Sequence, residues 1–181
     1  MSHDFNKRVE GKKKGDAMMK IVVLSDTHMP KKGKSLPERF VKELPSADAI
    51  IHAGDWQTKE VVEELKGYGL PVYGVYGNVD GEDIHSVFPY KQTINLNGYR
   101  IGLIHGHGEK KTTEKRALEE FKDEEVDLII FGHSHLPLTR YMNKVMLFNP
   151  GSVTDKRKLP YYSFGILTLE EEVHAEHIFF S

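Results

Sequence analysis

Seven candidate metal ligands follow the ends of five short apolar segments of this chain. The apolar segments are residues 21–24, 50–51, 72–76, 101–104 and 128–131. The candidate ligands that follow them are Asp26, His28, Asp55, Asn78, His105, His133 and His135. Such a mixture of oxygen and nitrogen ligands suits zinc, manganese, iron, cobalt or nickel, whereas calcium and magnesium prefer oxygen alone. These residue types predict a site for two divalent metal ions.

The apolar segments that carry these residues are typical of buried strands. Short apolar runs that alternate with helical patterns indicate an α/β sheet, whose ligand site lies outside the carboxyl ends of the strands. Asp26 and His28 are two residues apart, and if the backbone there is still extended, both side chains point the same way. Three glycines near the candidates let the backbone turn sharply and approach the ions: Gly54, Gly77 and Gly132.

The order of the predicted elements indicates the architecture. Strands over 20–24, up to 52 and over 72–76 alternate with helices that start near 38 and 58, a parallel pattern. The later elements are a helix over 113–122, a strand over 128–131, and hairpins over 93–104, 138–148 and 161–180. A parallel half followed by a more antiparallel half predicts an α/β fold with a four-layer α/β/β/α sandwich, in which two packed mixed sheets are flanked by helices.

Length and local composition predict the domain organisation. The 181 residues are enough for one domain with its own core. Residues 1–17 are polar and rich in lysine and glycine, so we expect a disordered N-terminal extension before a single domain over 18–181. A basic arm that binds nucleic acid is the alternative, but charge runs are usually just solvated.

Charge, cysteine content and hydropathy restrict the function. The net charge of −2 gives no strongly basic face, so we expect no nucleic-acid partner. The absence of cysteine excludes disulfides and thiolate zinc sites, and fits a cytoplasmic location. No apolar run approaches the roughly 20 residues of a membrane helix, so no membrane association is expected.

The motifs together resemble those of the calcineurin-like metallophosphoesterases, especially the small single-domain bacterial and archaeal phosphodiesterases. The resemblance covers residues 20–181. It rests on Asp26-x-His28, Gly54-Asp55, Gly77-Asn78-x-Asp80, His105-Gly106-His107 and Gly132-His133-x-His135. Residues 149–152 also match a loop of those proteins, which we expect to shape the substrate end of the site.

The resemblance implies a dinuclear phosphodiesterase that hydrolyses a small phosphodiester with a metal-bridging hydroxide. One ion would be bound by Asp26, His28, Asp55 and His135, and the other by Asp55, Asn78, His105 and His133. Asp55 would bridge the two ions. Manganese is the first choice of metal, with nickel, iron, cobalt and zinc as alternatives. A homo-oligomer, either a dimer or a tetramer, is also expected from the resemblance.

One position departs from the family pattern. Many larger members have a histidine directly after the motif asparagine that protonates the leaving group, and this chain has Val79 there. Asp55, Asn78 and His107 are the predicted catalytic residues, with His107 or water as the substitute proton donor. General acid catalysis typically contributes about 10²–10⁴-fold. We therefore expect activated diesters to react faster than monoesters with poor leaving groups.

A second function is compatible with the same fold. Residues 35–37 and 101–107 also resemble the retromer subunit of this superfamily, a non-catalytic protein-binding scaffold. That subunit lacks the bridging aspartate and the motif asparagine. Since Asp55 and Asn78 are both present here, the sequence favours an enzyme.

Several polar and aromatic residues near the motifs have less specific interpretations. We expect His52 to be a hydrogen-bonded neighbour of the ligands and Asp80 to orient the loop of Asn78. Trp56 fits a pocket wall and the core equally well. His174 and His177 are expected to face solvent or to pack.

Overall fold

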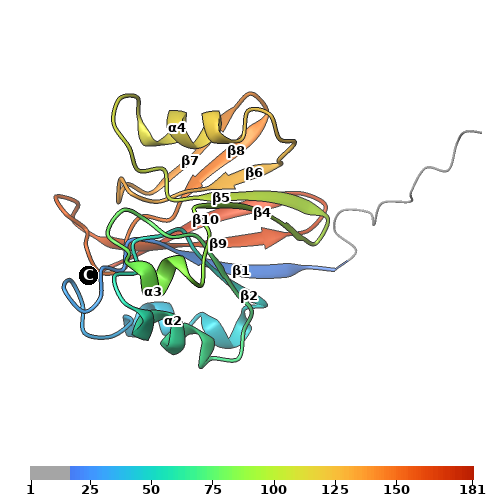
Figure 1. Ribbon diagram of the computed structural model, residues 1–181. Helices are drawn as coiled ribbons and strands as arrows, with labels where there is room; N and C mark the ends of the chain where they lie inside the picture. Colours follow the sequence, from blue (N-terminus) through green and yellow to red (C-terminus); the bar gives the residue numbers. More distant parts are fainter. Residues whose placement is uncertain (1–16) are drawn as a thin grey trace, which may run out of the picture.

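The computed structural model describes residues 17–181 as two five-stranded β-sheets that pack face to face between outer helices (Figure 1). The strand order is β10-β9-β1-β2-β3 in the first sheet and β4-β5-β6-β8-β7 in the second. This is the four-layer arrangement of two mixed sheets that the sequence predicts. The predicted extension over 1–17 lies outside the described residues, apart from residue 17.

The first sheet combines both ends of the chain. Its strands are β1 (Met19–Leu24), β2 (Ala49–His52), β3 (Val72–Gly74), β9 (Tyr162–Leu169) and β10 (Val173–Phe180). The first three run parallel, with Ile21 opposite Ala49. The C-terminal hairpin β9-β10 then adds antiparallel to β1, with Met19 opposite Leu169.

The second sheet is parallel at its centre and antiparallel at its edges. Its strands are β4 (Lys91–Leu96), β5 (Tyr99–Ile104), β6 (Leu128–Ile130), β7 (Leu138–Met142) and β8 (Val145–Asn149). The central strands β5, β6 and β8 run parallel, and the hairpin partners β4 and β7 form the edges. The second half of the chain is more antiparallel than the first, as expected, because its three hairpins are antiparallel; the parallel pairing of β5, β6 and β8 is an additional finding.

Helices cover the outer faces of the two sheets. They are α1 (Glu38–Val41), α2 (Lys59–Lys66), α3 (Glu82–His85) and α4 (Thr113–Glu120), with a 3₁₀ turn at Leu44–Ser46. The first three pack on the first sheet, and α4 packs on the second (Figure 1). The four-residue α3 was not predicted, because one helical turn carries no apolar periodicity.

Alternating side chains of β1 show how the layers hold together. Val22 and Leu24 point to the helix-covered face and share a cluster with Phe40 of α1. Ile21 and Val23 point to the interface between the sheets. All four β1 side chains are fully buried, which explains why this strand reads as a continuous apolar run. Burial on both faces fixes the carboxyl end of the strand, where the candidate ligands begin.

Candidate metal centre

All seven candidate ligands lie at the carboxyl ends of parallel strands, as expected. Asp26 and His28 follow β1, and Asp55 and Asn78 follow β2 and β3; His105 follows β5, and His133 and His135 follow β6. Backbone hydrogen bonds continue the parallel pairing into these loops, from Asp26 N to Gly54 O (2.9 Å) and from Gly132 N to His105 O (3.1 Å). The two sheets thus bring their loops together at one edge.

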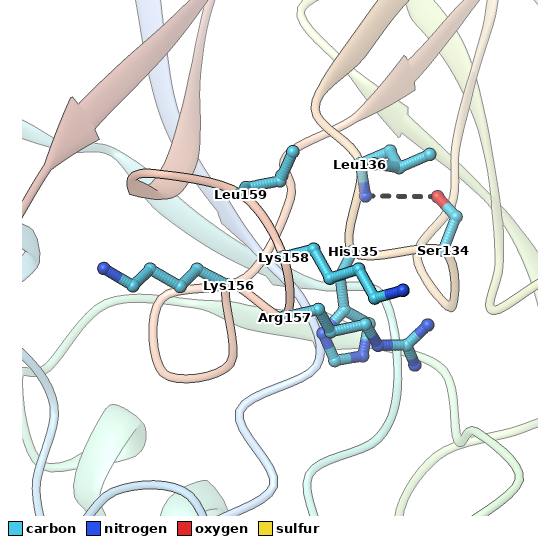
Figure 2. A pocket seen from close by; sticks show the side chains of 7 residues that line it. All are labelled: Ser134, His135, Leu136, Lys156, Arg157, Lys158 and Leu159. Carbon is cyan, nitrogen blue, oxygen red and sulfur yellow. Dashed lines mark hydrogen bonds between the residues drawn. The ribbon is translucent and has the colours of Figure 1, made fainter.

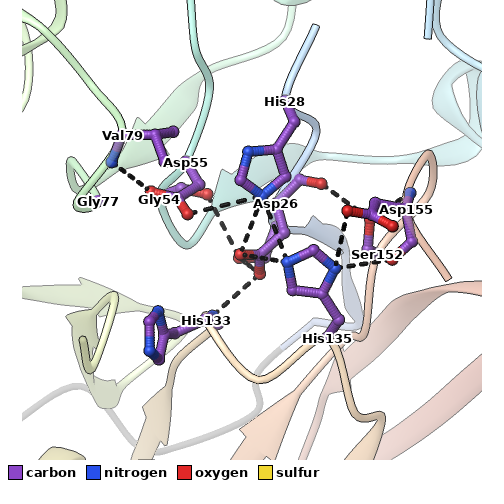
Figure 3. A network of polar contacts seen from close by, with 12 residues as sticks. Asp26, His28, Gly54, Asp55, Gly77, Val79, His133, His135, Ser152 and Asp155 are labelled. Carbon is purple, nitrogen blue, oxygen red and sulfur yellow. Dashed lines mark hydrogen bonds and ion pairs between the residues drawn. The ribbon is translucent and has the colours of Figure 1, made fainter. Parts of the chain in front are cut away.

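Three of these side chains form a first compact group. The candidate ligand atoms of Asp26, His28 and His135 all lie within 4.8 Å of one another (Figure 3). Asp26 Oδ1 is 3.3 Å from His135 Nε2 and 3.7 Å from His28 Nε2. The two imidazoles stack, with 3.3 Å between their Nε2 atoms. The two nitrogens and the oxygen face one common point.

Asp55, His105 and His133 form a second group within the same 4.8 Å limit. Asp55 Oδ2 lies 3.2 Å from His105 Nε2 and also 3.6 Å from His28 Nε2 of the first group. Asn78 joins through its Oδ1 atom, which is 3.0 Å from His133 Nδ1. Asp55 therefore lies between the two groups, and all seven candidates are gathered in one place.

Two buried ligand atoms of this cluster have no hydrogen-bond partner within residues 17–181. They are Asp26 Oδ1 and His105 Nε2, and both residues are fully buried. An unsatisfied buried polar atom typically costs about 1–3 kcal/mol. A divalent cation would satisfy both atoms at once, so the residues present fit the metal that the sequence predicts.

The ring nitrogen that faces away from the cluster is hydrogen-bonded in two of the histidines. Nδ1 of His105 lies 2.7 Å from the carbonyl oxygen of Ala53, and Nδ1 of His135 lies 2.7 Å from that of Asp155. A carbonyl accepts only a protonated nitrogen, so each ring donates from Nδ1. In the neutral ring this leaves the lone pair of Nε2 directed at the centre, the usual support for a metal-binding imidazole.

The ionisable groups of the centre stabilise one another's charges. Burial lowers the pKa of His105, but the negative charges of Asp26 and Asp55 outweigh it and raise that pKa to about 9. Burial opposes ionisation of Asp26, but the charge of His105 and the close rings of His135 and His28 hold its pKa well below the usual range. Protons on the histidines thus compensate the carboxylates in the way that cations would.

The backbone at the ligands differs from the expectation. The residues with a left-handed backbone are Asp26 (φ 55°), His28 (φ 45°), Asp55 (φ 59°), His133 (φ 64°) and His135 (φ 58°). The condition stated for Asp26 and His28, an extended backbone, is therefore not met. A left-handed conformation costs a non-glycine residue about 1–2 kcal/mol. Such strain accumulates at functional sites because the surrounding structure enforces it.

Glycine is required beside two ligand loops, in agreement with the sequence analysis. A Cβ atom on Gly77 would overlap the carboxylate of Asp55, and one on Gly132 would overlap the hydroxyl group of Ser25. Both glycines allow backbone to pack directly against a ligand or its support.

The loop at 149–152 supports a ligand from behind. Asn149 and Ser152 are buried, and the Ser152 hydroxyl donates to the backbone oxygen of Asp26 (2.8 Å). Thr154 donates to the carbonyl of Thr27. This loop thus supports Asp26, and a contribution of residues 149–152 to the substrate end stays a prediction.

Two supporting residues were not singled out in the sequence. Ser25 donates its hydroxyl proton to Asp26 Oδ2 (2.7 Å), and Asp155 accepts from His135. Ser25 is adjacent to a ligand and could have been suspected. Asp155 is 20 residues from the histidine that it orients, and no sequence pattern connects the two.

His52 and Trp56 are core residues beside the centre. His52 is fully buried, and its Nε2 lies 3.1 Å from the Thr27 hydroxyl, so it is a hydrogen-bonded neighbour and not a member of either group. Burial lowers the pKa of His52 to about 3. Trp56 is stacked between His52 and Phe88 and is fully buried. Of the two interpretations of Trp56, pocket wall or core residue, the structure therefore supports the core residue.

His107 lies next to the second group. Its ring centroid is 5.5 Å from that of His105, and its buried Nδ1 has no hydrogen-bond partner among the described residues. Burial and the charge of His105 lower the pKa of His107, which favours the neutral ring.

On β10, His177 packs on Phe148 and donates to Asn149 O, whereas His174 is exposed.

Comparison with known proteins assigns the family. Residues 19–172 match the model of the calcineurin-like phosphoesterase superfamily domain, and the chain belongs to this family. A probable metallophosphoesterase of Methanocaldococcus jannaschii is 34% identical over 161 residues, which covers 88% of this chain and 81% of the relative. Family and ligand groups together indicate a hydrolase that uses divalent metal.

Solved structures share the same fold. A structure described as a novel archaeal phosphodiesterase matches with a TM-score of 0.69 and 23% identity, over 90% of this chain and 100% of the other. Vps29 of Chaetomium thermophilum matches with a TM-score of 0.73 and 20% identity, over 90% and 98%. At these identities the likeness shows the fold alone.

No helix within residues 17–181 is long and apolar enough to cross a membrane.

Proposed function

We propose that the protein is a phosphodiesterase that uses two divalent metal ions. The position of Asp55 carries this proposal, since Oδ2 lies 3.2 Å from His105 Nε2 in one ligand group and 3.6 Å from His28 Nε2 in the other. A carboxylate between two such groups can be shared by two ions, as in other two-metal hydrolases. The phosphodiesterase among the structural neighbours also supports this activity.

The ligand assignment follows the two groups. One ion would be held by Asp26, His28, Asp55 and His135, and the other by Asp55, Asn78, His105 and His133. Manganese is the first choice, and nickel, iron, cobalt and zinc are alternatives for these ligands. When bound, the ions supply Lewis acidity and bring the pKa of a coordinated water close to neutrality.

The chain's own residues orient the reaction. Carbonyl oxygens hold the rings of His105 and His135 in place. Asn78 is exposed with Oδ1 toward His133, so its NH₂ group can donate to a phosphoryl oxygen. A fixed donor that stabilises developing charge on phosphate accelerates its transfer.

The side chains proposed to lie near the leaving group, Val79 and His107, favour diesters with good leaving groups. Val79 is 37% exposed beside the centre, where it offers an apolar side chain and no proton. His107 is the proposed substitute donor, although its lowered pKa favours the neutral ring. We propose a small phosphodiester as substrate and a dimer or tetramer in solution.

The alternative is a protein-binding scaffold, and the likeness to Vps29 favours it. Against it stands the buried cluster itself: Asp26 Oδ1 and His105 Nε2 are buried without a well-formed hydrogen bond, and a group of buried carboxylates and imidazoles is costly to retain without a metal-dependent role.

Hydrolysis of bis-p-nitrophenyl phosphate by the manganese-loaded protein tests the proposal. We expect activity in the wild type and in Asp123→Ala, an exposed aspartate away from the centre, and its loss in Asp55→Ala. Glycerol phosphate should react more slowly than the diester. An inactive, metal-loaded wild type would favour the scaffold.

A further inference from the structure

A small pocket opens beside the first ligand group, and His135 forms part of its wall (Figure 2). Its volume is about 250 Å³. The lining residues are Ser134, His135, Leu136, Lys156, Arg157, Lys158 and Leu159. The exposed surface of the pocket is almost wholly apolar, and the loop after Asp155 places the exposed cations Arg157 and Lys158 at its edge. The metal centre and the pocket meet at one imidazole.

The surface around this pocket is strongly basic, although the whole chain is not. Residues 29–34 and 155–158 together contain six lysines and arginines and one aspartate, whereas the chain has a net charge of −2. The two loops lie side by side, because Lys32 Nζ is 3.5 Å from Asp155 Oδ2 and Gly33 packs near Thr154. Positive charge is therefore concentrated on the side of the centre that His28 and His135 form.

Two cations of the pocket have no partner in the part of the chain that the structure describes. Lys156 donates to Pro160 O (3.1 Å) and lies over the ring of Tyr162. The side chains of Arg157 and Lys158, by contrast, form no hydrogen bond or ion pair with residues 17–181. Both side chains are exposed and line the pocket, so they are available to an anionic ligand.

Two cations on the opposite side of the centre, Arg116 and Lys111, are already used. Arg116, near His107, donates to the backbone oxygens of Gly106, Lys110 and Lys111. Lys111 in turn pairs with Glu119. These contacts hold the loop after β5 together. Among the described residues, the only arginine on the His107 side is therefore occupied with backbone contacts, whereas Arg157 is available.

Arg157 occupies a backbone conformation that does not suit an arginine. Its φ is 49°, where glycine or asparagine is less strained. Asp155 holds it there, since Oδ1 accepts the N–H of Arg157 (3.2 Å), and the backbone oxygen of the same aspartate accepts from His135. A strained backbone conformation next to a candidate metal ligand points to a functional role.

We propose that a second phosphate group of the substrate binds at the rim of this pocket and that Arg157 selects for it there, with Lys158 assisting. The inference rests on the proposed phosphodiesterase function. Arginine matches phosphate geometry with paired hydrogen bonds. Leu136 and Leu159 would contact the organic part between the two phosphates. The substrate class is thus a phosphodiester that carries an additional phosphate.

Two substrates that differ by one phosphate test this selectivity. Thymidine 5′-(p-nitrophenyl phosphate) and its 3′-phosphorylated form share the same leaving group and the same scissile bond. We expect the wild type to have a KM about 10- to 100-fold lower for the phosphorylated form, in line with one charge-assisted contact, with similar kcat. Arg157→Gln should remove most of this difference, and Arg100→Gln, at the far end of β5, should keep it.

A structural role of Arg157 is tested by Arg157→Gly. Because glycine relieves the left-handed strain, this variant should melt no lower than the wild type and still lose the selectivity. Equal KM values for both substrates in the wild type, or selectivity that survives both Arg157 variants, would overturn the inference.

A binding measurement separates this inference from the proposed function. Calorimetric titration of the manganese-loaded protein should give tighter binding of thymidine 3′,5′-bisphosphate than of thymidine 5′-monophosphate, and Arg157→Gln should abolish the difference. If neither diester is hydrolysed but this difference is found, the proposed function fails and the anion pocket stands. If hydrolysis occurs without any difference in binding, the pocket fails and the proposed function stands.

Discussion

The carboxylate of Asp80 accepts the backbone N–H of Asp55 at 3.0 Å, so one aspartate holds the other in place. Asp80 also accepts the N–H groups of Gln57 and Gly77, each at 2.8 Å. It therefore joins the loop after β2 to the loop after β3. Burial raises the pKa of Asp80, a cost that the hydrogen bonds from Gln57 and Gly77 offset in part. The role expected from the sequence, orientation of the Asn78 loop, extends here to the Asp55 loop.

Removal of this carboxylate should weaken both the fold and the centre. In Asp80→Ala, three backbone N–H groups lose a charged acceptor, and we expect a loss of about 2–4 kcal/mol in the free energy of unfolding. Metal affinity should fall about 10- to 100-fold, as for other residues that support ligands. Urea unfolding and manganese titration measure the two effects. The exposed Asp83→Ala should change neither, and an unchanged metal affinity in Asp80→Ala would contradict this role.

Gly77 should tolerate no side chain. A Cβ atom there would overlap the Asp55 carboxylate, so Gly77→Ala must displace the proposed bridging ligand. We expect loss of at least one bound ion and a decrease in diester hydrolysis of about 100-fold or more. Gly81→Ala is a matched control, because its nearest neighbour is Asp83 Oδ1 at 3.2 Å. Metal analysis of both variants after gel filtration makes the comparison, and a fully loaded Gly77→Ala protein would refute the expectation.

Metal binding should release protons at neutral pH. The pKa of His105 in the metal-free protein is raised to about 9, so its ring is protonated at pH 7 and must lose a proton before Nε2 can bind an ion. Affinity should therefore rise with pH between about 7 and 9, by about tenfold per pH unit for one proton. Calorimetry in buffers of different ionisation enthalpy counts the protons. Binding without proton release at pH 7 would contradict the charge state assigned to the centre.

The buried His52 should make the metal-free protein sensitive to acid. Burial lowers its pKa to about 3, whereas an unfolded histidine titrates near 6.5. Below pH 6.5 the unfolded state gains a proton that the folded state does not, so stability falls by about 1.4 kcal/mol per pH unit from this residue. Urea unfolding between pH 5 and 6.5 should show a shallower slope for His52→Gln than for the wild type. The exposed His174→Gln should keep the wild-type slope, and equal slopes in all three would be the contrary result.

The sequence was sufficient to predict which side chains meet. Apolar runs such as residues 101–104 identify buried strands, and the carboxyl-end rule then brings Asp26 and His105 together although 79 positions separate them. The hairpins could also be predicted from the sequence, because a local pair such as Asn97-Gly98 specifies the turn. These features depend on short segments of sequence. The structure contains the predicted strands and hairpins, with small differences in where the strands begin and end.

Other features depend on tertiary contacts and could not be predicted. The left-handed backbone at Asp26 is enforced by the hydroxyl groups of Ser152 and Thr154, which arrive from a distant loop. The strand that pairs with the C-terminal hairpin could not be predicted either, because nothing within β9 indicates that it pairs with β1. The basic pocket likewise arises only when residues 29–34 and 155–158 come together.

Anomalous diffraction from a crystal of the manganese-loaded protein tests the two-ion centre most directly. We expect two peaks about 3.5–4 Å apart, the spacing of two-metal hydrolases. One peak should lie among Asp26, His28 and His135 and the other among Asp55, His105 and His133, with Asp55 contacting both. A single peak, or peaks outside these two groups, would contradict the account.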